Sequence, residues 1–121
     1  MQTLNKIVPL YRVRDMPVML DNDIAKLYGV ATKRINEAVR NNLDKFEVDF
    51  YFELTKIEFE VLRSNISTAN FSKRRSTPKV FTKQGIYMLA TVLKSPIATK
   101  VSVSLIRMFA TLRRRHLNIV K

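Results

Sequence analysis

Only two glycines occur in the 121 residues, and one of them, Gly29, separates two short stretches whose apolar residues recur with helical spacing. Asp21 is a good N-cap for the first stretch, and Thr32 is the next N-cap candidate after the glycine. The apolar positions are Ile24, Ala25, Leu27 and Tyr28 before Gly29, and Ile35, Ala38, Val39 and Leu43 after it. A glycine placed here typically ends a helix in the left-handed conformation. The pattern predicts two short helices, from Asp21 to Tyr28 and over 32–42, joined by three or four residues.

Short β-forming stretches flank this helix pair. Residues 7–13 and 18–20 are rich in β-formers and lie on either side of a turn-like segment, Arg14–Pro17, which predicts a hairpin. Pro9 favours an edge position for the first strand. The aromatic segment 48–54 predicts a further strand.

Start signals predict three more helices. Thr55 and Glu58 form a capping box, so a helix is expected from Lys56 to about Asn65. Thr82 caps the next, in which Gly85 indicates close backbone packing, and Ser95 followed by Pro96 begins the last. The last helix runs towards His116 with an apolar seam of Ile97, Val101, Leu105, Met108 or Phe109, and Leu112. The fold class is therefore α+β: one domain over 5–93, followed by an amphipathic basic helix over 94–121.

Charge is unevenly distributed along the chain. Lys and Arg number 22 against 10 Asp and Glu, a net charge of +12, and residues 61–121 contain thirteen of these bases and no acid. Such a half-chain cannot neutralise itself with internal ion pairs, so it attracts polyanions, although a basic surface kept for solubility is the alternative. The absence of cysteine excludes disulfide scaffolds and thiolate metal sites. No apolar run approaches the ~18–20 residues of a membrane span, so we expect a cytoplasmic protein.

The segment around Gly29 meets the local demands of a helix-turn-helix: a small residue, Ala25, where the helices cross, a glycine in the turn, and apolar flanking positions. The outer face of the second helix then carries side chains that can read base edges in the major groove. The candidate DNA-contacting residues there are Lys33, Arg34, Asn36, Glu37, Arg40 and Asn41. A merely solvated helix face has a similar composition. The excess of bases elsewhere favours DNA.

A second basic element lies in the polar stretch 67–78, which predicts a flexible loop or hairpin tip leading into a strand at Lys79–Phe81. Its bases are expected to hold phosphates or enter the minor groove. The candidates are Lys73, Arg74, Arg75 and Lys79, with Arg107 and Arg114 of the last helix extending the path.

Short motifs resemble one family in order along the chain. They are Val18–Asp21, Ala25–Val30, Thr32–Lys33, Asn36–Val39, Asn41, Phe46, Asp49–Phe50, Phe52–Thr55, Leu62–Ser64, Phe81–Gly85 and Met88–Leu89. Over roughly residues 7–93 the chain is similar to the KilA-N DNA-binding domain family, in its ORF-6 N-terminal branch. The resemblance implies an α+β DNA-binding domain and a regulatory role in a phage or prophage, such as that of an antirepressor-like protein. Members often have glycine or proline after the position of Phe46, where this chain has Glu47.

Other functions find less support. His116 is the single histidine, which is too few for a histidine metal site. Asp21 and Asp23 are explained by the favourable interaction of acids with the N-terminal end of a helix dipole. The acids within 44–49 do not have the spacing of a calcium-binding loop. We expect no catalysis, cofactor or metal. Expected partners are double-stranded DNA and a second copy of the chain through the helix over 96–115, with no membrane. The alternative function is an antirepressor-like interaction module that acts mainly through another regulator protein. With either function, we expect the protein in the cytoplasm, at the bacterial nucleoid or in a phage-infected host.

Overall fold

The computed structural model describes residues 10–65 and 76–120, with the backbone alone for Asn65 and for 112–120. Within these ranges the chain forms five α-helices, one short 3₁₀ helix and four strands. In order they are β1 (Tyr11–Val13), β2 (Met16–Leu20), α2 (Asp21–Tyr28), α3 (Thr32–Arg40), η1 (Leu43–Lys45), β3 (Tyr51–Glu53), α4 (Lys56–Asn65), β4 (Lys79–Phe81), α6 (Lys83–Leu93) and α7 (Pro96–Val120). The predicted α+β class and long C-terminal helix are confirmed.

The strands form one antiparallel sheet in the order β1-β2-β4-β3, so the strand that comes last in the described sequence lies inside the sheet. β1 is an edge strand, as predicted, although Pro9 and the rest of 7–9 lie outside the described residues. The predicted strand over 48–54 is shorter than expected, because only Tyr51–Glu53 pairs with β4. The strand predicted at Lys79–Phe81 is confirmed.

The turn of the first hairpin is tighter than predicted. It consists of Arg14 and Asp15, with φ angles of 53° and 61°, while Met16 and Pro17 already pair with β1. Positive φ at both central residues characterises a type I′ turn, whose twist matches that of the flanking strands. The hairpin therefore needs only two residues outside its strands.

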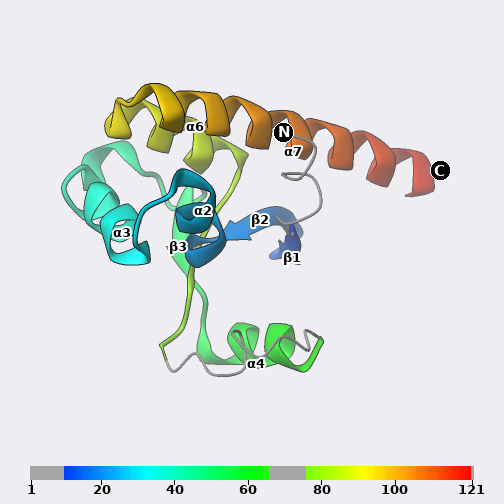
Figure 1. Ribbon diagram of the computed structural model, residues 1–121. Helices are drawn as coiled ribbons and strands as arrows, with labels where there is room; N and C mark the ends of the chain where they lie inside the picture. Colours follow the sequence, from blue (N-terminus) through cyan, green and yellow to red (C-terminus); the bar gives the residue numbers. More distant parts are fainter. Residues whose placement is uncertain (1–9, 66–75, 121) are drawn as a thin grey trace.

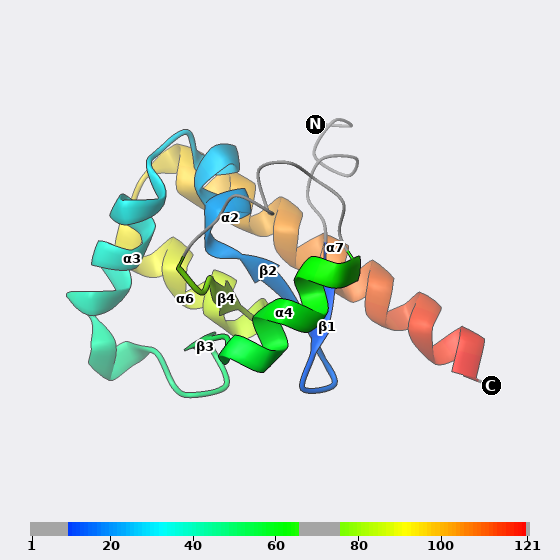
Figure 2. The ribbon, with the colours of Figure 1, turned by 90° about the horizontal axis from the view of Figure 1, so that it is seen from below.

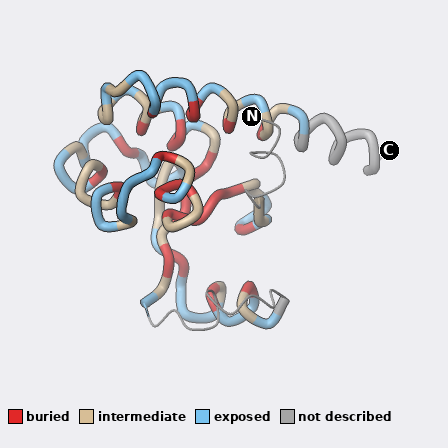
Figure 3. Tube along the Cα trace, in the orientation of Figure 1, coloured by how far each residue is buried: buried red, intermediate tan, exposed pale blue. Residues whose placement is uncertain are grey.

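Each face of the sheet has its own hydrophobic core. Met19 and Phe81, which pair across β2 and β4, belong to the larger cluster with α2, α3, α6 and α7. Leu20 and Val80, the next pair, belong to a smaller cluster with Phe59 of α4. Neighbouring residues point to opposite faces of a strand, so the sheet lies between four helices on one side and α4 on the other (Figures 1 and 3).

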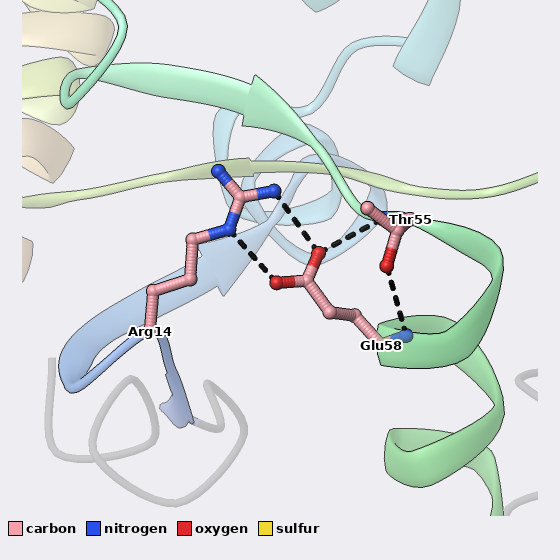
Figure 4. Close-up of polar contacts among 3 residues, drawn as sticks. All are labelled: Arg14, Thr55 and Glu58. Carbon is pink, nitrogen blue, oxygen red and sulfur yellow. Dashed lines mark hydrogen bonds and ion pairs between the residues drawn. The ribbon is translucent and has the colours of Figure 1, made fainter.

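The start of α4 is the predicted capping box. The Thr55 hydroxyl accepts from the Glu58 N–H at 3.1 Å, and the Glu58 carboxylate accepts from the Thr55 N–H at 2.8 Å. The same carboxylate accepts two N–H groups from Arg14 in the β1–β2 turn, at 2.8 and 3.1 Å (Figure 4). The hydrogen bond from Arg14 is the main reason that the pKa of Glu58 lies below its ordinary value. One acid thus caps α4 and attaches it to the hairpin.

The start of α6 also follows the sequence signals. The Thr82 hydroxyl accepts from the Gly85 N–H at 3.4 Å and donates to the Asp49 carbonyl at 2.7 Å. A Cβ on Gly85 would lie 1.9 Å from the Phe50 carbonyl oxygen. The close backbone packing predicted for this glycine is confirmed.

α7 begins as predicted, with the Ser95 hydroxyl accepting from the Ala98 N–H at 3.0 Å and Pro96 as the first helical residue. The described part of its apolar face packs against α6 and α2 within the same chain. In both views its C-terminal half extends away from α3 (Figures 1 and 2).

The predicted seam of α7 is partly wrong. Val101, Leu105 and Phe109 are buried as expected, but Ile97 is 64% exposed and Met108 is only half-buried. The helix is rotated so that its buried stripe continues through residues next to the expected ones, Ala98 and Ser102. The side chain of Leu112 lies outside the described residues.

Candidate nucleic-acid interface

The connection between α2 and α3 is a helix end followed at once by a helix start. Gly29 has φ 72°, its N–H donates to the Lys26 carbonyl at 3.2 Å, and the Val30 N–H donates to the Ala25 carbonyl at 3.0 Å. These two bonds define a Schellman motif, which needs the left-handed glycine. The predicted role of Gly29 is confirmed, and residues 29–31 form the short connection.

The predicted N-caps of these two helices are wrong by one position. Asp21 and Thr32 are the first residues inside their helices, and the cap positions are Leu20 and Ala31, without a side-chain cap bond from any described residue. The Asp21 side chain serves another purpose, because it is turned into the protein and is 0% exposed.

The buried face of α3 is shorter than predicted. Ile35 and Val39 are buried together with Ile24, Ala25 and Tyr28 of α2, which confirms the expected packing of the pair. The helix ends at Arg40, however, and the chain turns into η1, so the four-residue spacing no longer applies beyond it. Leu43 is 61% exposed, and Phe46 is buried in its place.

A polar network around Asn36, in the middle of α3, connects α3 to α2, β3 and β4. The Asp21 carboxylate accepts from the Asn36 side-chain amide of α3 at 3.0 Å, from the Asn22 N–H at 2.8 Å, and from the Lys79 N–H of β4 at 3.4 Å. The Tyr51 hydroxyl of β3 donates to the Asn36 side-chain oxygen at 3.1 Å. We name Asp21, Asn36 and Tyr51 the anchor network. Sequence reasoning missed it, because Asp21 has the pattern of a cap and Tyr51 that of a strand residue.

The network changes the interpretation of Asn36. The sequence predicts a base-reading residue, but both ends of its amide are bonded inside the protein and the side chain is half-buried. Burial, followed by the charges of Asp21 and Glu53, raises the pKa of Tyr51. The phenol therefore stays protonated near neutral pH and keeps its donor.

The exposed face of α3 carries the remaining candidates. Lys33, Arg34, Arg40 and Asn41 are exposed and Glu37 is half-buried, on the side opposite Ile35 and Val39. Among the described residues, the three cations have neither an ion pair nor a side-chain hydrogen bond. The face is thus a cationic strip whose hydrogen-bonding groups point to solvent.

The other predicted contact residues that the structure describes do not gather on one surface. Lys79 lies beside this region, on the same face of the sheet as Phe81, and is half-buried. Arg107 is exposed on the side of α7 opposite Leu105 and Phe109, away from the core. Lys73, Arg74 and Arg75, and the side chain of Arg114, lie outside the described residues.

The fold and this face define an α+β protein with a helix-turn-helix pair whose second helix exposes a polar surface. The family whose pattern matches the chain is the ORF6N domain, over residues 8–92. The chain belongs to the ORF6N domain family, which is associated with phages and prophages. Comparison with curated proteins and with solved structures gave no match. Among the described residues, no helix combines the length and apolar character needed to cross a bilayer.

Proposed function

We propose that the chain binds double-stranded DNA through α3, which enters the major groove. The observation that carries the proposal is the exposed face of α3, where Lys33, Arg34 and Arg40 have no internal ionic partner among the described residues. Cations of this kind contact phosphates and the acceptor edge of guanine. Asn41 and Glu37 add groups suited to adenine and cytosine.

The helix-turn-helix geometry supports the same proposal. Lys33 and Arg34 lie in the first turn of α3, where backbone N–H groups and the helix dipole also favour phosphate. Docking by the N-terminal part of a second helix is the common arrangement for this motif. Asn36 is omitted from the reading residues because its amide is bonded to Asp21 and Tyr51.

Basic residues outside α3 are proposed to hold the DNA backbone. The Lys79 N–H donates to the Asp21 carboxylate of α2, so Lys79 lies beside the helix pair, and Lys73, Arg74 and Arg75 precede it in the sequence. Arg107 and Arg114 of α7 would contact only DNA that continues around the molecule. We propose a KilA-N-type regulator of phage or prophage origin as the finer assignment within the family.

The test is a titration of labelled duplex at several salt concentrations. If about 5–8 phosphates are contacted, log K against log salt should have a slope of about −4 to −7. Lys33→Ala should weaken binding and make the slope shallower. Lys56→Ala is the matched control, because it removes one exposed cation from α4 on the opposite side of the sheet and should change neither.

The competing function is an antirepressor-like module that binds another regulator protein. It predicts that affinity for the partner protein depends only weakly on salt and that competitor duplex does not disrupt the complex. Absence of duplex binding in dilute buffer, or equal loss in both variants, would contradict the proposal.

A further inference from the structure

The sequence pattern makes Asn36 one of several equivalent residues on the polar side of α3, but its contacts set it apart. Its amide nitrogen donates to Asp21 and its oxygen accepts from Tyr51. Reversal of the amide would place its oxygen against a carboxylate, so these neighbours allow one orientation only. Asn36 therefore connects α3 to the start of α2 and to β3.

The anchor network is built on a fully buried carboxylate, which makes the bonds to it consequential. A buried carboxylate is costly unless donors satisfy it, and Asp21 is buried with Asn36 as one of its donors. A displacement of α3 would withdraw this donor. The Tyr51 ring packs edge-on against Phe46 and Phe81, with ring centroids 6.1 and 4.8 Å away, so its hydroxyl has a fixed position.

The other contacts of α3 specify its position less sharply. Ile35 and Val39 pack in the core, and apolar packing is not directional. A hydrogen bond weakens steeply when its angle or length departs from a narrow range. Lys33 precedes Asn36 by three residues and Arg40 follows it by four, so both lie on the turns that the network fixes.

We propose that Tyr51 and Asp21 are positioning residues that, through Asn36, set the sequence discrimination of α3. This inference rests on the proposed function. Contacts to phosphates tolerate a small shift of a helix, whereas bidentate contacts to base edges do not. Loss of the anchor network should therefore reduce binding to the preferred site and leave binding to random duplex nearly unchanged.

The variant for the test is Tyr51→Phe, which removes one hydroxyl and keeps the aromatic ring. The duplexes are a site selected from a random library, its single-base-pair substitutions, and a random duplex. The net free energy of one such bond corresponds to about three- to tenfold in an equilibrium constant, so affinity for the selected site should fall by up to that factor. The salt slope should not change. The loss of discrimination should be spread over several base pairs.

Tyr28→Phe is the matched control. The Tyr28 hydroxyl is bonded to Ser102 between α2 and α7, so Tyr28→Phe also removes one tyrosine hydroxyl bond, at a more buried place and without a partner on α3. This variant should be less stable than the unchanged protein and should keep the full ratio of selected to random binding. Asn36→Ala serves as the second variant and should behave as Tyr51→Phe does.

Amide hydrogen exchange gives a readout without DNA. Tyr51→Phe should speed exchange in α3 relative to α6. Unchanged protection of α3, a loss confined to one base pair, or an equal loss on both duplexes would overturn the positioning role. Failure of the unchanged protein to bind any duplex would instead refute the proposed function, and the discrimination claim with it.

Discussion

At the scale of single residues, the sequence predicted positions where local backbone conformation decides and missed positions where distant partners decide. Gly29 was predictable, because a helix end in the left-handed conformation favours glycine whatever surrounds it. At Gly85 the sequence indicated close packing, but not that the neighbour is the Phe50 carbonyl. The internal partners of Asn36 were not predictable, because Asp21 and Tyr51 each lie fifteen residues away in sequence. A polar residue on a helix has the same pattern whether it faces DNA or a buried carboxylate.

The two glycines should respond differently to alanine. Gly85→Ala would place a methyl group 1.9 Å from the Phe50 carbonyl oxygen and should destabilise the fold by roughly 1–3 kcal/mol, because backbone must move. Gly29→Ala meets no atom within 4 Å and should cost about 1 kcal/mol, from its positive φ. Urea unfolding measures both. A larger loss for Gly29→Ala would contradict the packing at Gly85.

Arg40 and Lys73 are predicted to contribute to DNA binding in different ways. Arg40→Ala should cost ~1–3 kcal/mol on the preferred duplex and relax discrimination at one base pair. Lys73→Ala should weaken all duplexes alike and reduce the salt slope by about one. Binding to a set of base-substituted duplexes measures both effects. Equal losses on preferred and random DNA for Arg40→Ala would remove the base-reading role.

At the scale of elements, three of the helix starts with a capping signal were predicted at the right residue, while those at Asp21 and Thr32 were wrong by one position. Thr55 with Glu58, Thr82, and Ser95 with Pro96 begin helices where the sequence indicates. Strand bounds were harder except at Lys79–Phe81, because three of the four strands have only three residues, too few for a periodic pattern. The rotation of α7 was missed at Ile97, since a stripe over several turns fits two neighbouring sets of positions about equally well.

The attachment of α4 to the hairpin should depend on pH. Arg14 lowers the pKa of Glu58 in the folded protein, so the ion pair stabilises the fold above the ordinary glutamate pKa and is lost as the pH falls through the lowered one. Glu58→Gln keeps the capping bond but loses the pair, at a cost of about 0.5–1 kcal/mol near pH 7. The difference in unfolding free energy between Glu58→Gln and the unchanged protein, measured with urea, should be smaller near pH 3 than at pH 7. A difference that persists at low pH would contradict the ionic attachment.

At the scale of the whole molecule, the α+β class followed from the sequence but the layering did not. No local pattern states that α4 covers one face of the sheet while α2, α3, α6 and α7 cover the other. That division depends on which strand neighbours which, and β4 pairs with strands from two distant parts of the chain. The homodimer through α7 remains a prediction, although the described part of the seam is occupied by α6 and α2.

The packing of α7 within the chain gives a test of that prediction. Leu105→Ala should lower the free energy of unfolding by ~2–5 kcal/mol, because Leu105 is fully buried. Val103→Ala, at an exposed position of the same helix, should change it by less than about 0.5 kcal/mol. If α6 and α2 alone cover the described part of the seam, urea midpoints will be the same at low and high protein concentration. A midpoint that rises with concentration would show that the seam is shared between copies.

The inner place of β4 in the sheet has a consequence for synthesis. A nascent chain that has reached Asn65 holds the β1–β2 hairpin and β3 but lacks Lys79–Phe81, the strand that joins β2 to β3. A lone hairpin is marginally stable in water, and loops must close before distant pairings form. Residues 21–40 are therefore expected to acquire a fixed platform only after Lys79–Phe81 has been synthesised and can pair with β2 and β3.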